Sequence, residues 1–264
     1  MRIALGIEYD GSSFSGWQSQ PSGNTVQDVL EKALAKIAGV KTAASCAGRT
    51  DAGVHGIGQV VHIDPTVVRP LTAWVRGVNT FLPHSVAVSW AREVGDEFHA
   101  RYSARSRSYR YVLLNHPVRP ALMASRVGWF HQPLDEAAMQ AGADLLLGTH
   151  DFSAFRAAEC QAKTPVKTLK KAEMRRQGEL VSFDFQADAF LHHMVRNLVG
   201  SLIYVGKGLR PPEWMAELLE QKKRSLAAPT FAPGGLYFMG VEYEEKWRLP
   251  SEGRIILPSL FPTA

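Results

Sequence analysis

A glycine-rich segment of this 264-residue chain displays a single carboxylate among small side chains. Asp51 lies in this segment, which runs from Gly48 to Gly58 and contains four glycines. Glycines permit tight turns and a close approach of the backbone to a ligand. The residues alone leave two interpretations open. Asp51 belongs to an Asx-type turn, the commoner use of Asp before Ala-Gly, or its carboxylate is displayed for chemistry as a nucleophile or base.

A predicted helix over residues 190–205 carries the second candidate group. Its apolar stripe consists of Leu191, Val195, Leu198 and Leu202. On a different face lie His192, Arg196 and Gly200, beside His193, Asn197 and Ser201. Charge, amide and small residues together indicate close approach to a ligand or to another strand. The alternative for Arg196 taken singly is an ordinary exposed arginine.

Other reaction chemistries lack their sequence signatures. The chain has no Walker-type loop, no dinucleotide-binding Gly-x-Gly-x-x-Gly after a strand and no Gly-x-Ser-x-Gly elbow. Two cysteines are too few for a disulfide framework or a four-cysteine zinc site. We predict no cofactor and no metal. A metal-dependent phosphodiesterase stays the minor alternative, with ligands drawn from Asp51, His55, His150, Asp151, His192 and His193.

Positive charge is concentrated in one part of the chain. The net charge is +5, and residues 98–134 contain six arginines and no acid, so the remaining residues sum to −1. Aromatic residues are interleaved with these arginines, a combination typical of nucleic-acid binding. A second basic stretch covers residues 163–176. The alternative interpretation is a solvated basic strand face.

Hydrophobic periodicity predicts the elements that position these groups. In the first half we expect strands over 2–9, 42–47, 58–64 and 86–92, with helices beginning after Thr25 and over 70–81. In the second half we expect strands over 106–114, 168–176, 180–187 and 236–244, with helices over 135–147, over 190–205 and after Pro211-Pro212. Both halves therefore follow the order β-α-β-β-α-β.

This repeated order predicts an α+β fold of two ferredoxin-like units with mainly antiparallel sheet and a catalytic cleft between them. We place the first domain at residues 1–98, the second, with the basic strand, at 99–247, and a tail at 248–264. No apolar run reaches the length of a membrane-spanning helix, and an acid interrupts the N-terminal apolar stretch. We therefore expect a soluble, cytoplasmic protein.

Several segments together resemble the tRNA pseudouridine synthase A family over about residues 1–247. The most specific is the run Gly48-Arg49-Thr50-Asp51-Ala52-Gly53-Val54-His55. The others, in order, are Tyr9-Asp10-Gly11, Phe14-x-Gly16-Trp17-Gln18-x-Gln20, Thr25-Val26-Gln27, Phe98-His99-Ala100-Arg101-Tyr102-Ser103-Ala104, Tyr109-Arg110-Tyr111, His150-Asp151-Phe152 and Met194-Val195-Arg196-Asn197.

The resemblance implies isomerisation of uridine to pseudouridine at positions 38, 39 and 40 of the tRNA anticodon stem-loop by a cofactor-free homodimer. It implies that Asp51 is the catalytic carboxylate, and it thereby reverses the preference for a mere turn. We expect Arg196 to pair with Asp51 and Tyr109 to stack on the extracted base. Further contacts to phosphates or the flipped nucleotide are expected from Arg49, Arg101, Arg105, Arg107 and Arg110. The rival is a non-catalytic RNA-binding protein of two ferredoxin-like units.

Overall fold

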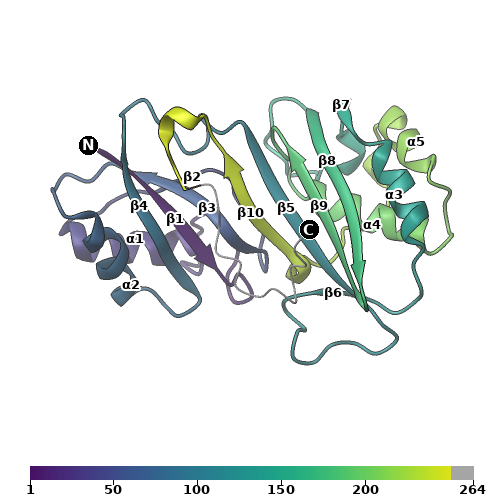
Figure 1. Cartoon of the computed structure of the whole chain (residues 1–264), viewed down its shortest axis with the longest axis horizontal. Coiled ribbons are helices and arrows are strands. Elements are labelled where there is room, and N and C mark those ends of the chain that lie inside the picture. Colours follow the sequence, from purple (N-terminus) through teal and green to yellow (C-terminus); the bar gives the residue numbers. More distant parts are fainter. Residues whose placement is uncertain (251–264) are drawn as a thin grey trace. The chain divides into compact units, whose positions relative to one another are not determined.

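The computed structural model describes residues 1–250 and divides the chain into two compact units. Unit 1 comprises Met1–Arg107 together with the segment that begins at Tyr237, and unit 2 comprises Ser108–Leu236. The chain is a mixed α/β protein whose strands pair mostly antiparallel (Figure 1). No helix within the described residues is long and apolar enough to cross a membrane.

The strands of unit 1 form one sheet. They are β1 (Arg2–Tyr9), β2 (Ser45–Cys46), β3 (His55–Ile63), β4 (Val86–Val94) and β10 (Leu236–Glu242). The order β4-β1-β3 is antiparallel, and β2 pairs antiparallel with β3. The last strand, β10, returns to unit 1 and pairs in parallel with β3 through Tyr237 and Phe238.

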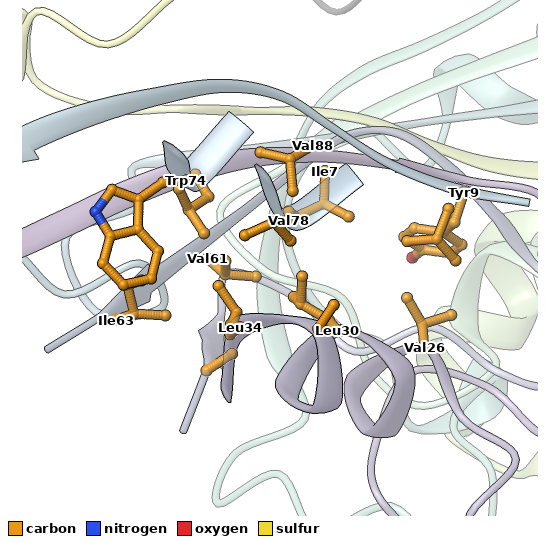
Figure 2. Close-up of a cluster of buried hydrophobic side chains, with 14 of the residues drawn as sticks. Ile7, Tyr9, Val26, Leu30, Leu34, Val61, Ile63, Trp74, Val78 and Val88 are labelled. Atoms are coloured by element: carbon orange, nitrogen blue, oxygen red, sulfur yellow. The ribbon is translucent and has the colours of Figure 1, made fainter. Parts of the chain in front are cut away.

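Two helical segments cover one face of this sheet. The first is α1 (Val26–Ala38); the second is a π-helical turn (Ala73–Gly77) that continues into α2 (Val78–Phe81). The hydroxyl of Thr25 caps α1 by accepting the N–H of Asp28, and Gly39 ends the helix with φ +75°. Figure 2 shows Val26, Leu30 and Leu34 of α1 packed in the same cluster as strand residues. The predicted cap and apolar face of α1 are confirmed.

The opposite face of the unit 1 sheet is covered as well. The small residue Ala4 lies there in a second apolar cluster with Phe98, Ala100 and Trp247. The alternation predicted for residues 2–9 is therefore confirmed, and segments from residues 98–100 and 241–249 bury its second side. These contacts place residues 99–107 and 237–247 with unit 1, whereas the sequence-based division assigned them to the second domain. Of the predicted tail, residues 251–264 lie outside the described residues.

The strands of unit 2 follow the order β5-β9-β8-β7, with β6 parallel to β5. Its strands are β5 (Ser106–Asn115), β6 (Gly128–Phe130), β7 (Gly148–Asp151), β8 (Val166–Gln177) and β9 (Leu180–Ala187). Its helices are α3 (Glu136–Asp144), α4 (Met194–Gly206) and α5 (Trp214–Gln221). Helix α3 packs against β8 and α4, and α4 is buried on nearly all sides.

The structure differs from the predicted elements at a few places. Strands β6 and β7 were not predicted, because three or four residues are too short for alternation to show. Helix α4 begins at Met194 rather than at 190, because His193 adopts φ +61° and interrupts the helix before it. The helix expected over 70–81 contains the π-helical turn at Ala73–Gly77.

Candidate functional site

Asp51 occupies a tight turn between β2 and β3 of unit 1. Its carbonyl oxygen accepts the N–H of Val54 at 3.1 Å, and Gly53 within the turn has φ +77°. The N–H of Gly53 donates to the carbonyl of Phe14 at 3.3 Å, which ties the turn to the loop after β1. The side chain of Asp51 is half-buried. The segment therefore forms a turn through the backbone carbonyl of Asp51, and the half-buried carboxylate lies on a fixed backbone.

Thr50 fixes the backbone immediately before Asp51 through its side chain and its carbonyl group. Its buried hydroxyl hydrogen-bonds the hydroxyl of Tyr9 at 2.9 Å, and its carbonyl accepts the N–H of Trp17 at 3.0 Å. Burial raises the pKa of Tyr9, so this hydroxyl stays protonated. Gly16 lies so close that a Cβ there would approach the Thr50 carbonyl to 2.7 Å. The backbone on both sides of Thr50 is thus fixed by β1 and the loop that follows it.

A buried amide and a buried imidazole hold the two ends of the glycine-rich segment. The side chain of Gln59, fully buried, donates to the carbonyl of Gly48 at 2.6 Å and accepts its N–H at 3.3 Å. The ring of His55 stacks on Tyr237 at 4.7 Å, and its Nδ1 accepts the N–H of Gly11 at 3.1 Å. His55 therefore has a structural role inside unit 1.

The arginines predicted to contact RNA divide into exposed and structurally engaged groups. Arg49, Arg101 and Arg105 are exposed, and Arg105 lies 3.3 Å from Glu244. By contrast, Arg107 donates to the carbonyls of Arg101 and Ala47 at 2.5 Å and 3.2 Å.

Arg110 is also engaged with the protein. Its Nε and Nη2 donate to the two carboxylate oxygens of Asp184 at 2.6 Å and 3.0 Å, a bidentate pair. Both side chains are largely shielded from solvent. The sequence could not show that Arg110 is engaged rather than exposed, because its partner Asp184 is 74 residues away along the chain.

Tyr109 and Arg196 both belong to unit 2. Tyr109 on β5 is 9% exposed, and its ring meets Phe190 edge to face at 5.0 Å. Arg196 is on the first turn of α4, where its Nε donates to the carbonyl of Phe231 at 2.8 Å. The N–H of Phe231 donates in return to the Arg196 carbonyl at 3.3 Å. The structure thus fixes Asp51 within unit 1, and Tyr109 and Arg196 within unit 2.

The segment 228–231 packs along the polar face of α4. Asn197, fully buried, accepts hydrogen bonds from Thr230 at 2.7 Å and Arg224 at 3.0 Å. A Cβ on Gly200 would lie 2.5 Å from the carbonyl oxygen of Pro229. This face was predicted to approach a ligand or another strand; in the structure an irregular segment of the chain itself approaches it. Asn197 was not singled out as a site residue, although its place beside Arg196 was the available signal.

The second basic stretch, residues 163–176, is largely engaged with acids and carbonyls of unit 2. Lys171 and Arg175 lie 3.0 Å and 3.2 Å from Glu173, and Arg176 pairs with Glu136. The ammonium group of Lys167 donates to two backbone carbonyls. These partners favour a structural role over a nucleic-acid contact for most of the stretch.

A surface cavity of about 810 Å³ lies in unit 2, between the start of α3 and the loop after α4. Leu134, Asp135, Lys207 and Arg210 are among the residues that line it. None of the predicted site residues does. The cavity is therefore separate from the groups that the sequence singled out.

Comparisons with known proteins agree with the family resemblance of the sequence motifs. A model of the tRNA pseudouridine synthase family matches residues 6–103 and 143–244. The tRNA pseudouridine synthase A of Dechloromonas aromatica (strain RCB) is 63% identical over 250 residues, 95% of each chain. The protein of that name from Aromatoleum aromaticum is 60% identical over 262 residues, 99% of each chain. In Chromobacterium violaceum it is 62% identical over 252 residues, 95% of this chain and 96% of the relative. This chain belongs to the tRNA pseudouridine synthase family.

Proposed function

We propose that this chain isomerises uridine to pseudouridine at positions 38, 39 and 40 of the tRNA anticodon stem-loop, with Asp51 as the catalytic carboxylate. The family and the names of the relatives support a tRNA substrate and an isomerase reaction. The observation that carries the assignment of Asp51 is its place in a turn fixed by Thr50, Gly53 and the loop after β1. Such a fixed backbone aims a carboxylate without a cost in reorganisation at the moment of reaction.

The reaction needs no redox change and no external reagent. The N1–C1′ bond of uridine breaks, the base turns, and a C5–C1′ bond forms; C5 loses a proton and N1 gains one. One carboxylate suffices to begin this sequence. Asp51 has three routes: attack on C1′, attack on C6 of uracil, or removal of a proton from C2′ to give a glycal.

Arg196 and Tyr109 are the proposed partners of Asp51 in this reaction. Arg196 would pair with the carboxylate and keep it ionised. The hydrogen bond from its Nε to Phe231 supports this role, because it limits the orientations of the guanidinium. Tyr109 would stack on the extracted base and help to remove the C5 proton. Its packing against Phe190 supports a fixed ring.

The substrate must leave the stack of the anticodon stem to reach a side chain, at a cost of about a few kcal/mol. We infer that exposed arginines repay this cost through phosphate contacts, with Arg49, Arg101 and Arg105 as the candidates. For Arg107 and Arg110 we infer roles within the protein, because their guanidiniums donate to backbone carbonyls and to Asp184.

We also infer the finer architecture. Each unit would be ferredoxin-like; the order β4-β1-β3-β2 of unit 1 and the order β5-β9-β8 of unit 2 support this. We further infer a homodimer that works in the cytoplasm, where its tRNA substrate is found.

Tritium release from tRNA labelled at C5 of uracil tests the function. Wild-type protein should release tritium in the presence of EDTA, whereas Asp51→Ala should release none and still bind tRNA. Asp96→Asn serves as the control, because Asp96 is an exposed acid of the same unit with its side chain 84% accessible.

Three results would contradict the proposal. Binding without release by wild-type protein from a competent tRNA would favour the non-catalytic RNA-binding protein. Loss of wild-type activity in EDTA would favour metal-dependent chemistry. Release by Asp51→Ala at the wild-type rate would remove Asp51 from the mechanism.

A further inference from the structure

A turn of unit 1, Phe98–Ser103, is held by side chains from several parts of that unit. Its base is buried: Phe98 and Ala100 are inaccessible to solvent, and the ring of Phe98 meets those of Trp247 at 5.1 Å and Tyr243 at 5.2 Å. Arg2 donates to the carbonyl of Phe98 at 2.6 Å. The turn therefore begins from a fixed position in an apolar cluster.

Ala100 is held through both of its backbone groups. Its N–H donates to Nδ1 of His62 at 3.2 Å, and its carbonyl accepts the hydroxyl of Tyr243 at 2.6 Å. His62 is a β3 residue with 5% of its surface exposed. Tyr243 follows β10, so two separate parts of unit 1 fix this one peptide.

His99 holds the tip of the turn. Its Nδ1 accepts the N–H groups of Arg101 at 3.1 Å and Tyr102 at 3.4 Å. Ser103 closes the turn, because its hydroxyl accepts the His99 N–H at 2.9 Å and its N–H donates to the His99 carbonyl at 2.9 Å. Arg107, which lies beyond the turn in sequence, donates to the carbonyl of Arg101. The backbone that carries Arg101 and Tyr102 is thus fixed at nearly every polar group.

These contacts need both imidazoles in the neutral form, since a protonated Nδ1 cannot accept. Burial lowers the pKa of His62 to about 4, and the neighbouring charges of His99 and Arg2 add to the effect. Burial likewise lowers the pKa of His99. Both rings are therefore acceptors at neutral pH. The two rings also meet each other at 4.5 Å.

The side chains at the tip of this rigid turn point to solvent. Tyr102 is 76% exposed, the most exposed aromatic ring among the described large hydrophobic residues. Its ring contacts His99 at 4.3 Å, and the guanidinium of Arg101 lies 5.7 Å from its centroid. Folding gains little from an exposed ring, whereas a fixed aromatic beside an arginine suits an unpaired nucleotide, whose base can stack while its phosphate is bound.

We propose that Tyr102 and Arg101 form a preformed contact for an unpaired nucleotide of the tRNA, and that His62 and His99 are the residues that position it. Tyr102 stacks on the base, and Arg101 binds the adjacent phosphate. This inference rests on the proposed function only in taking tRNA as the ligand. Because the turn is ordered before the ligand arrives, little conformational entropy is lost on binding.

Steady-state tritium release and direct tRNA binding test the contact itself. Tyr102→Ala should raise KM and Kd for tRNA by about 5- to 150-fold, the range for loss of one stacked base, with a much smaller change in kcat. Tyr102→Phe should restore binding, since the ring is kept. Val68→Ala is the control, because Val68 is also strongly exposed on unit 1. Arg101→Gln should weaken binding more than Arg92→Gln, which removes a positive charge from β4 that is also exposed.

The positioning role is tested at His99. His99→Asn keeps a side-chain acceptor two residues before the donor N–H, as in an Asx turn, and should keep KM near the wild-type value. His99→Leu removes the acceptor and should raise KM as Tyr102→Ala does, with kcat at saturating tRNA changed less than KM. Equal KM values for His99→Asn and His99→Leu would refute the positioning role.

The outcomes separate this inference from the proposed function. If wild-type protein is active but Tyr102→Ala binds tRNA with the wild-type Kd, the contact is refuted and the function stands. If wild-type protein releases no tritium while Tyr102→Ala still weakens tRNA binding, the function is refuted and the contact stands.

Discussion

At the scale of single residues, the backbone turn at Asp51 is compatible with the catalytic role that we propose for its carboxylate. The segment does form a turn, and the turn is what presents the carboxylate. The glycines that pack against the Asp51 turn have a physical purpose. A Cβ on Gly11 would lie 1.9 Å from the carbonyl oxygen of Val54, and a Cβ on Gly16 would lie 2.7 Å from that of Thr50. A glycine-rich sequence around one acid therefore indicates a backbone that is pinned closely rather than one that is loose.

Arginine substitutions should separate structural from substrate contacts. Arg110→Gln leaves Asp184 shielded without its bidentate partner, so we expect a loss of about 2 kcal/mol in the free energy of unfolding and little change in KM. Arg105→Gln is the matched comparison, because its partner Glu244 is more exposed and a solvent-exposed ion pair contributes little to stability. Urea unfolding and tRNA kinetics measure both variants. A large increase in KM for Arg110→Gln, with stability unchanged from the wild type, would show that Arg110 contacts tRNA instead.

His62 should make the protein less stable in mild acid. The pKa of its imidazole is about 4 when folded, against a reference value of 6.5, so the unfolded state binds more protons between these pH values. Stability should therefore fall by about 2 kcal/mol as the pH drops from 7 to 4.5, and level off below pH 4. The groups that face the ring are His99, Arg2 and Asp64.

The variant His62→Asn isolates this effect. The amide oxygen of Asn can accept the Ala100 N–H but does not titrate, so the slope of stability against pH should flatten. Urea unfolding at several pH values measures that slope. An unchanged slope in His62→Asn would assign the acid sensitivity to other groups.

At the scale of elements, most of the fold could be predicted from periodicity. The residues 2–9, with apolar side chains at every second position, form β1, and the stripe after Thr25 forms α1. The prediction of secondary structure failed where contacts between distant residues determine whether an element forms or where it begins. Strands β6 and β7 exist only through their partners β5 and β8, and the start of α4 depends on the left-handed conformation of His193.

The candidate site was predictable to the same extent. Motif residues such as Asp51 and Arg196 could be named from the sequence, since their types and neighbours are local information. The engagement of Arg107 and Arg110 could not, because their partners Ala47 and Asp184 are 60 and 74 residues distant. Nor could the role of His62, whose contact with Ala100 spans 38 residues.

Helix α4 offers a test at this scale. In Gly200→Ala the new Cβ would clash with the Pro229 carbonyl, so the segment 228–231 must move away from the helix. We expect a loss of about 2 kcal/mol in stability and a fall in kcat, because Phe231 no longer orients Arg196. Ser201→Ala is the control: it removes only the hydrogen bond from Ala228 and should cost about 1 kcal/mol. Wild-type stability and kcat in Gly200→Ala would contradict this account.

At the scale of the whole molecule, the charge is uneven rather than large. The segment 98–134 contributes +6 to a net charge of +5. Binding of tRNA should therefore weaken linearly on a plot of log K against log salt concentration, by about 0.7 to 0.9 per phosphate contact. Arg101→Gln should reduce the slope by about one, and Arg110→Gln should leave it unchanged. A slope near zero for the wild type would contradict polyanion binding.

Unit 1 is discontinuous in sequence, since its last strand, β10, follows the whole of unit 2. During translation, the parallel partner of β3 and the aromatic partners of Phe98 are therefore still unmade when residue 107 leaves the ribosome. The 129 residues 108–236 come first, which takes about 6 to 26 s at about 5–20 residues per second. A nascent chain arrested before residue 237 thus lacks Tyr243 and Trp247, and the turn that carries Arg101 and Tyr102 is among the last parts of the molecule to be completed.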